Sequence, residues 1–271
     1  MTYWEVLVVV AASCYLGCQE EETGGVGATS GLPDAGVDGG ADSGQDGGSG
    51  PDGGTGGFGT PCEEPTGDSN VVQDTEFDDA GWTLTESSTP GADVSTDPTG
   101  QSLSGGAGED PSAYRSMTHT IENPAEGADE NCTSESCAYT LVVTHEYQST
   151  PYTPQGTELY IDYSESHIIT APAFAGAAVG WSFAIWQDGS RFTYVQEQGA
   201  SAFTDLTWTT EYRCGLVAAD FAPAPGPDFS AGAPDMTFGF TRSNTNTTPD
   251  TLQRNEHGID DFRVTIVRDP L

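Results

Sequence analysis

The chain contains no lysine and only seven arginines, against 42 aspartates and glutamates, which gives a formal net charge of −35 at pH 7. Lysine forms Schiff bases with carbonyl substrates and completes a phosphate-binding P-loop, so both chemistries are excluded. An acidic chain also lacks the basic patch that binds nucleic acid, so we expect no nucleic-acid partner. Such a charge suits either a saline medium or divalent cations, and charge alone does not separate the two.

The sequence also lacks an apolar run long enough to cross a bilayer as a helix, which takes about 20 residues. A short apolar stretch at residues 6–12 is instead typical of an export signal. With Cys18 behind it, the segment (residues 1–18) resembles a bacterial lipoprotein signal, whose cysteine becomes the lipid-modified N-terminus. The resemblance implies export and lipid anchoring through Cys18 to the outer membrane or the cell surface. Cys14 is the alternative site, and a buried N-terminal strand is the other interpretation.

Glycine and acidic residues dominate residues 19–61, where basic residues are missing altogether. Apolar content this low does not offset the entropy lost on ordering, so the segment is predicted to be a disordered linker. A glycine-rich coil of this length spans roughly 36 Å. Three Asp-Gly-Gly units, at Asp38, Asp46 and Asp52, also suggest a calcium-binding repeat. Their irregular spacing and the missing apolar core residue favour a charged spacer.

Short alternating apolar runs, separated by glycine, proline, aspartate and serine, begin near residue 70 and indicate β-strands. The expected strands are 70–77, 81–86, 112–122, 138–147, 157–170, 179–187, 191–197, 203–212, 236–242 and 258–267. Long helical periodicity is absent. About ten strands in roughly 200 residues predict an all-β fold, an antiparallel two-sheet β-sandwich of the jelly-roll type over residues 62–271.

Four cysteines fall in this predicted domain. Cys132 and Cys137 bracket an acidic loop and would form a local disulfide, which leaves Cys62 to pair with Cys214. The second bridge would fasten the end of the linker to the sandwich. A zinc site is disfavoured, because the chain has no C-x2-C pair and its cysteines and histidines do not cluster in the sequence.

Two segments at the ends of the domain carry a family resemblance. Residues 71–84 place a Phe and an acidic residue before Gly-Trp, and residues 257–266 carry Ile-Asp-Asp. These features resemble the opening and closing strands of galactose-binding-like and carbohydrate-binding jelly-roll modules. Residues 113–120 and 227–234 are similar to uncharacterised exported bacterial proteins of the same architecture.

The resemblance also implies a structural calcium where the first and last strands meet. Its ligands would be Asp78 and Asp260, with Glu76 as a possible substitute. Strand alternation independently places Asp260 on the same row as Phe262, where a carboxylate must be paired, protonated or metal-bound. Oxygen ligands suit calcium, and pairing of Asp260 with an arginine is the alternative.

The best catalytic candidates are Asp162 and Glu165. Their segment resembles the Glu-x-Asp-x-x-Glu strand of concanavalin-like glycoside hydrolases, in which alternate carboxylates act on one sugar. Tyr160 occupies the nucleophile position, and Glu158 lies one strand repeat too far away. The alternative interpretation is a half-exposed strand with solvated acids.

Other catalytic motifs fail on spacing. There is no G-x-S-x-G elbow, and the pair His145-Glu146 lacks the second histidine of a zinc protease, because position 149 is serine. The four histidines are scattered along the sequence. Each is expected to be a polar strand residue rather than a base or a metal ligand, so we expect no enzyme activity.

Aromatic residues supply a candidate sugar-binding surface. Trp181 and Ile185 share one face of the expected strand 179–187, and Trp186 points to the other. If the Trp181 row is core, then Trp186 with Tyr194 or Trp208 would form an open platform for sugar stacking. Ordinary core or rim packing is the alternative.

These features predict a non-catalytic cell-surface lipoprotein that displays a jelly-roll binding module, with glycans as ligand and calcium as structural ion. A divergent glycan-active hydrolase or lyase using Asp162 and Glu165 is the second hypothesis. A purely structural envelope protein is the third.

Overall fold

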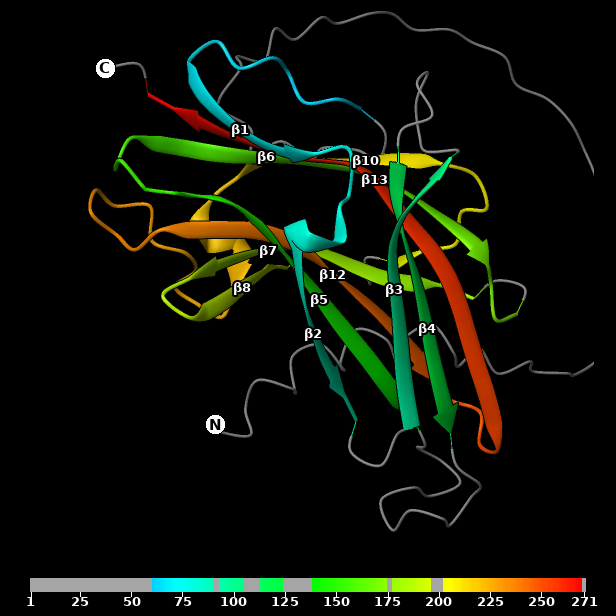
Figure 1. Cartoon of the computed structure of the whole chain (residues 1–271). Coiled ribbons are helices and arrows are strands. Elements are labelled where there is room, and N and C mark those ends of the chain that lie inside the picture. Colours follow the sequence, from blue (N-terminus) through cyan, green and yellow to red (C-terminus); the bar gives the residue numbers. More distant parts are fainter. Residues whose placement is uncertain are drawn as a thin grey trace, which may run out of the picture. The chain divides into compact units, whose positions relative to one another are not determined.

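A computed structural model describes residues 60–89, 93–104, 113–123, 138–174, 177–195 and 202–269. Their strands form two antiparallel sheets packed as a sandwich (Figure 1), so the predicted fold class is confirmed. Helical structure in this part of the chain comprises two single 3-10 turns, η2 (Asp79–Gly81) and η3 (Ala218–Asp220). None of its helices is long and apolar enough to cross a lipid bilayer.

Several sequence predictions lie outside the described residues. They are the signal at residues 1–18 with Cys18, nearly all of the linker at residues 19–61, and the local disulfide between Cys132 and Cys137. These remain predictions.

The first sheet, called the β13 sheet below, is built around the longest described strand. Its strands lie in the order β10 (Thr209–Leu216), β6 (Glu158–Ala171), β13 (Thr251–Arg268), β4 (Ala113–Asn123) and β3 (Asp93–Ser104). The additional strand β1 (Asp68–Asp74) pairs with the C-terminal half of β13. The sheet therefore brings the start and the end of the domain side by side.

The second sheet, called the β12 sheet below, has β12 near its centre. Its strands lie in the order β11 (Phe221–Ala222), β8 (Ser190–Tyr194), β7 (Val179–Gln187), β12 (Met236–Asn246), β5 (Tyr139–Tyr152) and β2 (Trp82–Ser88). A short strand, β9 (Ala202–Phe203), also pairs with β7.

Strand boundaries differ from the sequence prediction where the interior is polar. β13 begins at Thr251 rather than at 258, because its first half turns Asn255 and His257 inward in place of apolar residues. The expected strand 203–212 is split between β9 and β10, and β3 and β11 were not predicted. Apolar alternation therefore predicted the strands whose core-facing side chains are apolar, and it missed the first half of β13, whose inward-facing side chains are polar.

Aromatic side chains form the core between the two sheets, around Trp82 at the start of β2. The Trp82 ring packs against Phe77, Phe240 and Phe262, with ring centroids 5.7, 5.2 and 5.2 Å apart. Large aromatic side chains remove the most apolar surface per residue from water. The Trp181 row of β7 is buried in the same cluster, which meets the condition on which an outward-facing Trp186 depends.

The predicted disulfide between Cys62 and Cys214 is present, with an S–S distance of 2.04 Å. It joins the segment that leads into β1 to strand β10 at the edge of the β13 sheet. The bridge closes a loop across a sequence separation of 152 residues.

Replacing Cys62 and Cys214 with serine should lower the free energy of unfolding by about 5 kcal/mol, because the open chain gains conformational entropy when unfolded. Denaturant unfolding of the full chain measures this loss. The same double substitution at Cys132 and Cys137 is the control. A bridge there closes only a short loop, so its loss should cost about 2 kcal/mol. Equal losses for the two pairs would contradict the prediction.

Candidate functional site

The outer face of the β12 sheet carries one large aromatic side chain, Trp186, beside small and hydroxyl-bearing residues. Trp186 on β7 lies opposite Thr237 of β12 and Arg191 of β8. In the next row, Gly239 of β12 lies opposite Glu146 of β5. We call this surface, made by Trp186, Arg191, Thr237, Gly239 and Glu146, the Trp186 face.

Gly239 allows the indole of Trp186 to lie close to the backbone of a central strand. A Cβ atom added at Gly239 would lie 3.0 Å from Cζ3 of Trp186 and 1.9 Å from the carbonyl oxygen of His145. Any other residue would therefore clash with the backbone and press on the ring. A glycine inside a strand often marks such a close approach.

Polar groups surround the indole. Thr237 donates a hydrogen bond from Oγ1 to Oε1 of Glu146, and both residues are half-buried. The neighbouring rows of the same face carry mostly hydroxyl side chains, namely Thr83, Thr85, Thr144, Ser182, Thr193 and Thr241. The Trp186 face thus combines one aromatic ring with hydrogen-bonding groups of several kinds.

Neither Tyr194 nor Trp208 joins Trp186, which corrects the predicted platform of Trp186 with Tyr194 or Trp208. Tyr194 shares the inner row of β8 with Phe192 and packs on the core, with its ring centroid 6.2 Å from that of Phe221. Trp208 packs edge-on against Tyr114 of the β13 sheet, at 5.2 Å. The register of β8 against β7 determines on which face of the sheet Tyr194 lies. The alternation of residues within β8 does not reveal that register.

The predicted calcium ligands lie in different environments. Glu76 and Asp78 are exposed, whereas Asp260 is fully buried and its Oδ1 accepts a hydrogen bond from the Asp261 N–H. Glu76, Asp78 and Asp260 do not form a set with carboxylate oxygens within 4.8 Å of one another in the described part of the chain. The calcium site stays a prediction.

Asp74, which the sequence analysis did not single out, organises the opening segment. Its buried carboxylate accepts hydrogen bonds from the N–H groups of Glu76 and Phe77, both at 2.9 Å, and from Nε1 of Trp82 at 2.8 Å. Phe77 has a positive φ of 50°, so this turn needs local hydrogen bonds to hold it. An aspartate that caps the N–H groups two and three residues later is a recognised turn signal.

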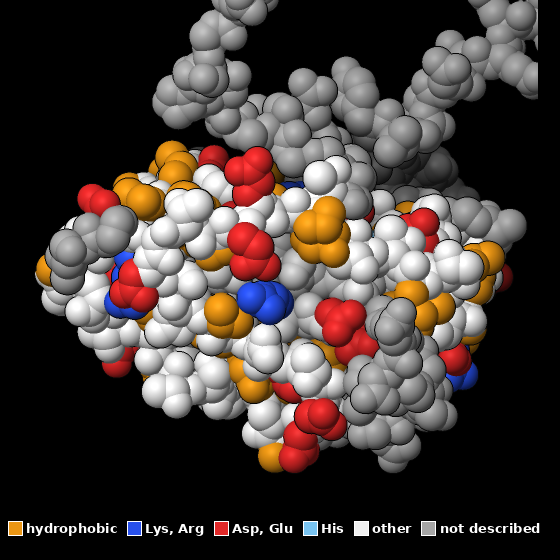
Figure 2. Space-filling model, turned by 90° about the horizontal axis from the view of Figure 1, so that it is seen from above, with side chains coloured by type: hydrophobic (Ala, Val, Ile, Leu, Met, Phe, Trp, Pro, Cys, Tyr) orange, Lys and Arg blue, Asp and Glu red, His pale blue; other side chains and the backbone are white. Residues whose placement is uncertain are grey.

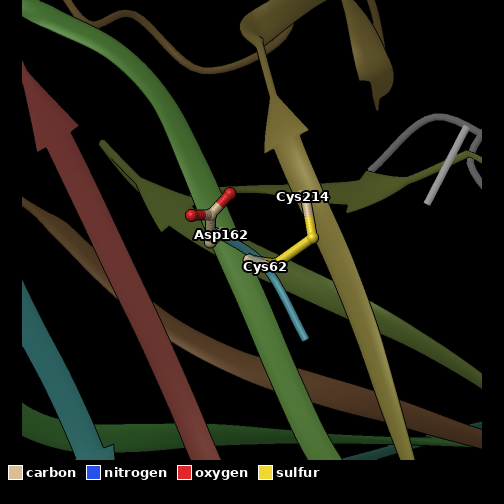
Figure 3. A group of neighbouring side chains, drawn as sticks. All are labelled: Cys62, Asp162 and Cys214. Carbon is tan, nitrogen blue, oxygen red and sulfur yellow. A yellow bond between two sulfur atoms is a disulfide. The ribbon is translucent and has the colours of Figure 1, made fainter. Parts of the chain in front are cut away.

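The single trio of potential metal ligands in the described residues is Cys62, Asp162 and Cys214 (Figure 3). The two sulfur atoms are bonded to each other, so they are not available as thiolate ligands. Asp162 lies beside the bridge, where its Oδ1 accepts a hydrogen bond from the Gly215 N–H at 2.8 Å. Burial raises the pKa of the Asp162 carboxyl.

Asp162 and Glu165 point to opposite faces of β6, which overturns the geometry of the hydrolase hypothesis. Asp162 faces the disulfide, and Glu165 is fully buried between the sheets. A pair of catalytic carboxylates must flank one glycosidic bond. Residues three apart on a strand face opposite ways, so these two carboxylates cannot do so.

Glu165 instead belongs to a buried ion pair. Nη2 of Arg242 on β12 lies 2.7 Å from Oε1 of Glu165, and both side chains are completely buried. The Tyr163 hydroxyl donates to Oε2, and Nδ1 of His167 lies 3.4 Å from Oε1. Burial by itself raises the pKa of Glu165, but the Arg242 charge and the hydrogen bonds from His167 and Tyr163 outweigh it and lower the pKa to about 2.

All four histidines are buried between the sheets, although they are scattered in the sequence. The rings of His119 and His257 meet edge-on at 4.6 Å, and His145 stacks on Phe240 at 4.5 Å. Burial lowers the pKa of His119 to about 4. Burial and the nearby positive charges lower the pKa of His145 and His257 well below the ordinary value. The rings of His119, His145 and His257 are therefore neutral interior groups at pH 7.

Comparison with known proteins gives a fold likeness at low identity. No protein-family model and no curated protein matches the chain. Solved structures with some likeness include a Clostridium thermocellum xylanase 10B fragment with CBM22-1 and GH10 modules in complex with xylohexaose (11% identity, TM-score 0.32). The match covers 74% of this chain and 29% of that one.

Two single modules show a likeness of similar strength. The CBM22-1 xylan-binding domain of Paenibacillus barcinonensis Xyn10C has 12% identity and a TM-score of 0.29, with 76% of this chain and 99% of that one covered. The mannan-recognising module TmCBM27 has 8% identity and a TM-score of 0.30, with 73% and 98% covered. Values this low transfer no function, so function has to be inferred from the residues of the chain itself.

The free energy of unfolding should fall as the pH drops below about 6.5. Histidines of the unfolded chain take up protons near that pH, whereas His119 takes one near pH 4 and burial holds the pKa values of His145 and His257 well below 6.5. The unfolded state then binds more protons, so acid favours unfolding. His119 alone should account for about 3 kcal/mol of the loss by pH 4. Asp162 and Glu211, whose pKa values are raised by burial, act with the opposite sign but are only partly buried.

Urea unfolding at several pH values from 7 to 4 measures this dependence. A His119→Gln variant serves as the control, because it removes one titrating group and should flatten the slope. Stability that does not change over this range would contradict the prediction.

Proposed function

We propose that the chain is a non-catalytic glycan-binding module that binds through the Trp186 face. The observation that carries the proposal is the half-buried indole on the outer side of a sheet, set against the backbone of Gly239. A large aromatic ring on an outer face is positioned to pack against an apolar ligand surface. Thr237 and Glu146 beside it supply hydrogen bonds.

A sugar ring matches this combination of groups. Its C–H face is apolar and packs on an aromatic ring, while its hydroxyls at the rim both donate and accept hydrogen bonds. Threonine hydroxyls also do both, and a carboxylate accepts. The Trp186 face therefore suits a saccharide better than a purely apolar ligand.

The acidic surface narrows the ligand class. Figure 2 shows acidic side chains scattered over one face of the molecule, with few basic ones. Together with the net charge of −35, this disfavours anionic glycans, because like charges repel. We therefore favour neutral glycans as ligands.

The proposed setting is the outside of a bacterial cell. A lipid on Cys18 would anchor the protein to the outer membrane or cell surface, and residues 19–61 would hold the module away from it. The apolar stretch at residues 6–12 and the acidic, glycine-rich composition of the linker support this part of the proposal.

A glycan array probed with the full chain, carrying Cys18→Ser to prevent lipidation, tests the function. Titration of an array ligand should then give at least a tenfold weaker affinity for Trp186→Ala, about 1.4 kcal/mol, because the packing surface is lost. Trp208→Ala is the matched control and should bind normally, because Trp208 packs against Tyr114 of the other sheet. An array without ligands would favour the structural-protein hypothesis. An unchanged affinity for Trp186→Ala would rule out this surface.

Calcium bound by Asp260, with Asp78 or Glu76, is a further part of the proposal. The complete burial of the Asp260 carboxylate supports it, since hard oxygen ligands suit calcium. A chelator should lower the melting temperature of the wild-type chain, and added calcium should restore it. In Asp260→Asn the chelator should have no effect. A wild-type melting temperature that is insensitive to the chelator would contradict the site.

A further inference from the structure

A groove of about 470 Å³ lies between β1 and the end of β5. Ligand sites for small molecules typically have volumes of about 300–1,000 Å³. The groove shares no residue with the Trp186 face. One wall is made by Asn70 to Gln73 of β1, and the opposite wall includes Tyr147, Ser149 and Thr150 of β5.

Strand lengths explain why a groove forms here. β2 begins at Trp82, which lies opposite Tyr147 of β5. The remainder of β5, up to Tyr152, therefore continues without β2 beside it. The register of β5 against β12 also shifts in this stretch, so its residues leave the regular line of the sheet. In the described part of the chain β1 pairs with β13 alone, and its other edge is free to form a wall.

The walls of this β1 groove carry neutral hydrogen-bonding groups. Asn70 and Gln73 both border the groove at the free edge of β1, but their side chains leave opposite faces of this strand, because residues three apart on a strand face opposite ways. Both side chains are exposed, and the described residues supply no hydrogen-bond partner for their carboxamides. Arg268 also lines the groove, but its charge is paired with Asp68 at 2.6 Å. No lining residue in the described part of the chain is acidic, although the chain has 42 acidic residues.

Tyr147 gives the groove an ordered aromatic group. Its ring is held by Trp82 and Phe262, with centroids 4.9 and 6.0 Å away. Burial, and then the charge of Asp74, raise the pKa of its hydroxyl, so the phenol stays protonated at neutral pH. The fixed phenol can donate a hydrogen bond, while each carboxamide both donates and accepts.

We propose that the β1 groove is a second glycan site, selective for neutral oligosaccharides. Carboxamides, hydroxyls and one fixed aromatic ring recognise a rim of sugar hydroxyls without a charge. The inference rests on the proposed glycan-binding function for its ligand class, but it uses other residues. Two sites on one module would bind a repetitive polysaccharide by avidity, which exceeds the affinity of either site.

An extended peptide is the competing occupant, because the free edge of β1 could pair with another strand. Strand addition uses backbone groups and tolerates loss of the Asn70 and Gln73 side chains. A saccharide that is held by either carboxamide would bind the double variant more weakly. Substituting these side chains therefore separates the two ligand classes.

The test is calorimetric titration of the full chain, carrying Cys18→Ser, with a panel of neutral hexasaccharides built from glucose, xylose, mannose and galactose units. A galacturonic acid hexamer is the anionic comparison. We expect two sites per chain for at least one neutral hexasaccharide, and much weaker binding of the acid. In Asn70→Ala/Gln73→Ala one site should weaken at least tenfold, and the site lost in Trp186→Ala should remain.

Ser69→Ala, on the same strand but outside the groove lining, is the matched control and should retain both sites. Asn70 and Gln73 are exposed, and an unchanged melting temperature would show that the double variant is folded. One site, lost in Trp186→Ala and unaffected in the double variant, would overturn the β1 groove and leave the proposed function intact. No hexasaccharide binding at all would overturn both. An extended peptide library that binds the double variant as well as the wild type would assign the groove to strand pairing instead.

Discussion

The buried ion pair between Arg242 and Glu165 is the interaction on which the interior of the sandwich depends. Arg242 comes from the β12 sheet and Glu165 from the β13 sheet, so the pair links the two layers directly. Burying two charges is costly, and such a pair seldom adds net stability compared with apolar residues. The pair instead constrains how the sheets are aligned. A buried Arg242 without a partner would be costly, so the sheets must place Glu165 beside it. We infer that the pair sets the alignment of β6 over β12.

The ion pair also divides the interior into two zones. Toward β1 and β2 the space between the sheets is filled by aromatic rings around Trp82. Toward the other end, neutral groups such as His119, His257 and Asn244 replace them, with a contact of 2.6 Å between Nδ1 of His119 and Oδ1 of Asn244. A positive neighbour such as Arg242 favours the neutral form of a histidine. Burial is the main cause that lowers the pKa of His119 and His257, and the positive charge of Arg242 adds to it.

This arrangement explains how far the sequence could predict the structure. Apolar alternation and the parity of the cysteines were sufficient for the fold class, for most strands and for the bridge between Cys62 and Cys214, because these follow from local pattern and from counting. The start of β13 was missed because its inner row is polar. Tyr194 was misplaced because its face depends on the register between β8 and β7. Glu165 resembled a catalytic acid because sequence spacing does not reveal the partner that buries it.

Gly239 is unfavourable for strand β12 itself, but the packing of neighbouring residues requires a glycine at this position. A glycine in a strand interior destabilises it by roughly 0.5–1 kcal/mol relative to alanine, and β12 lies between two neighbouring strands of its sheet. No side chain fits at Gly239, because the backbone of β5 and the indole of Trp186 occupy the space. Conflicts between local preference and the overall fold concentrate at functional sites. The same central strand carries Arg242 on its inner side and supports Trp186 on its outer side, so the constraint that aligns the sheets also fixes the backbone under the proposed binding surface.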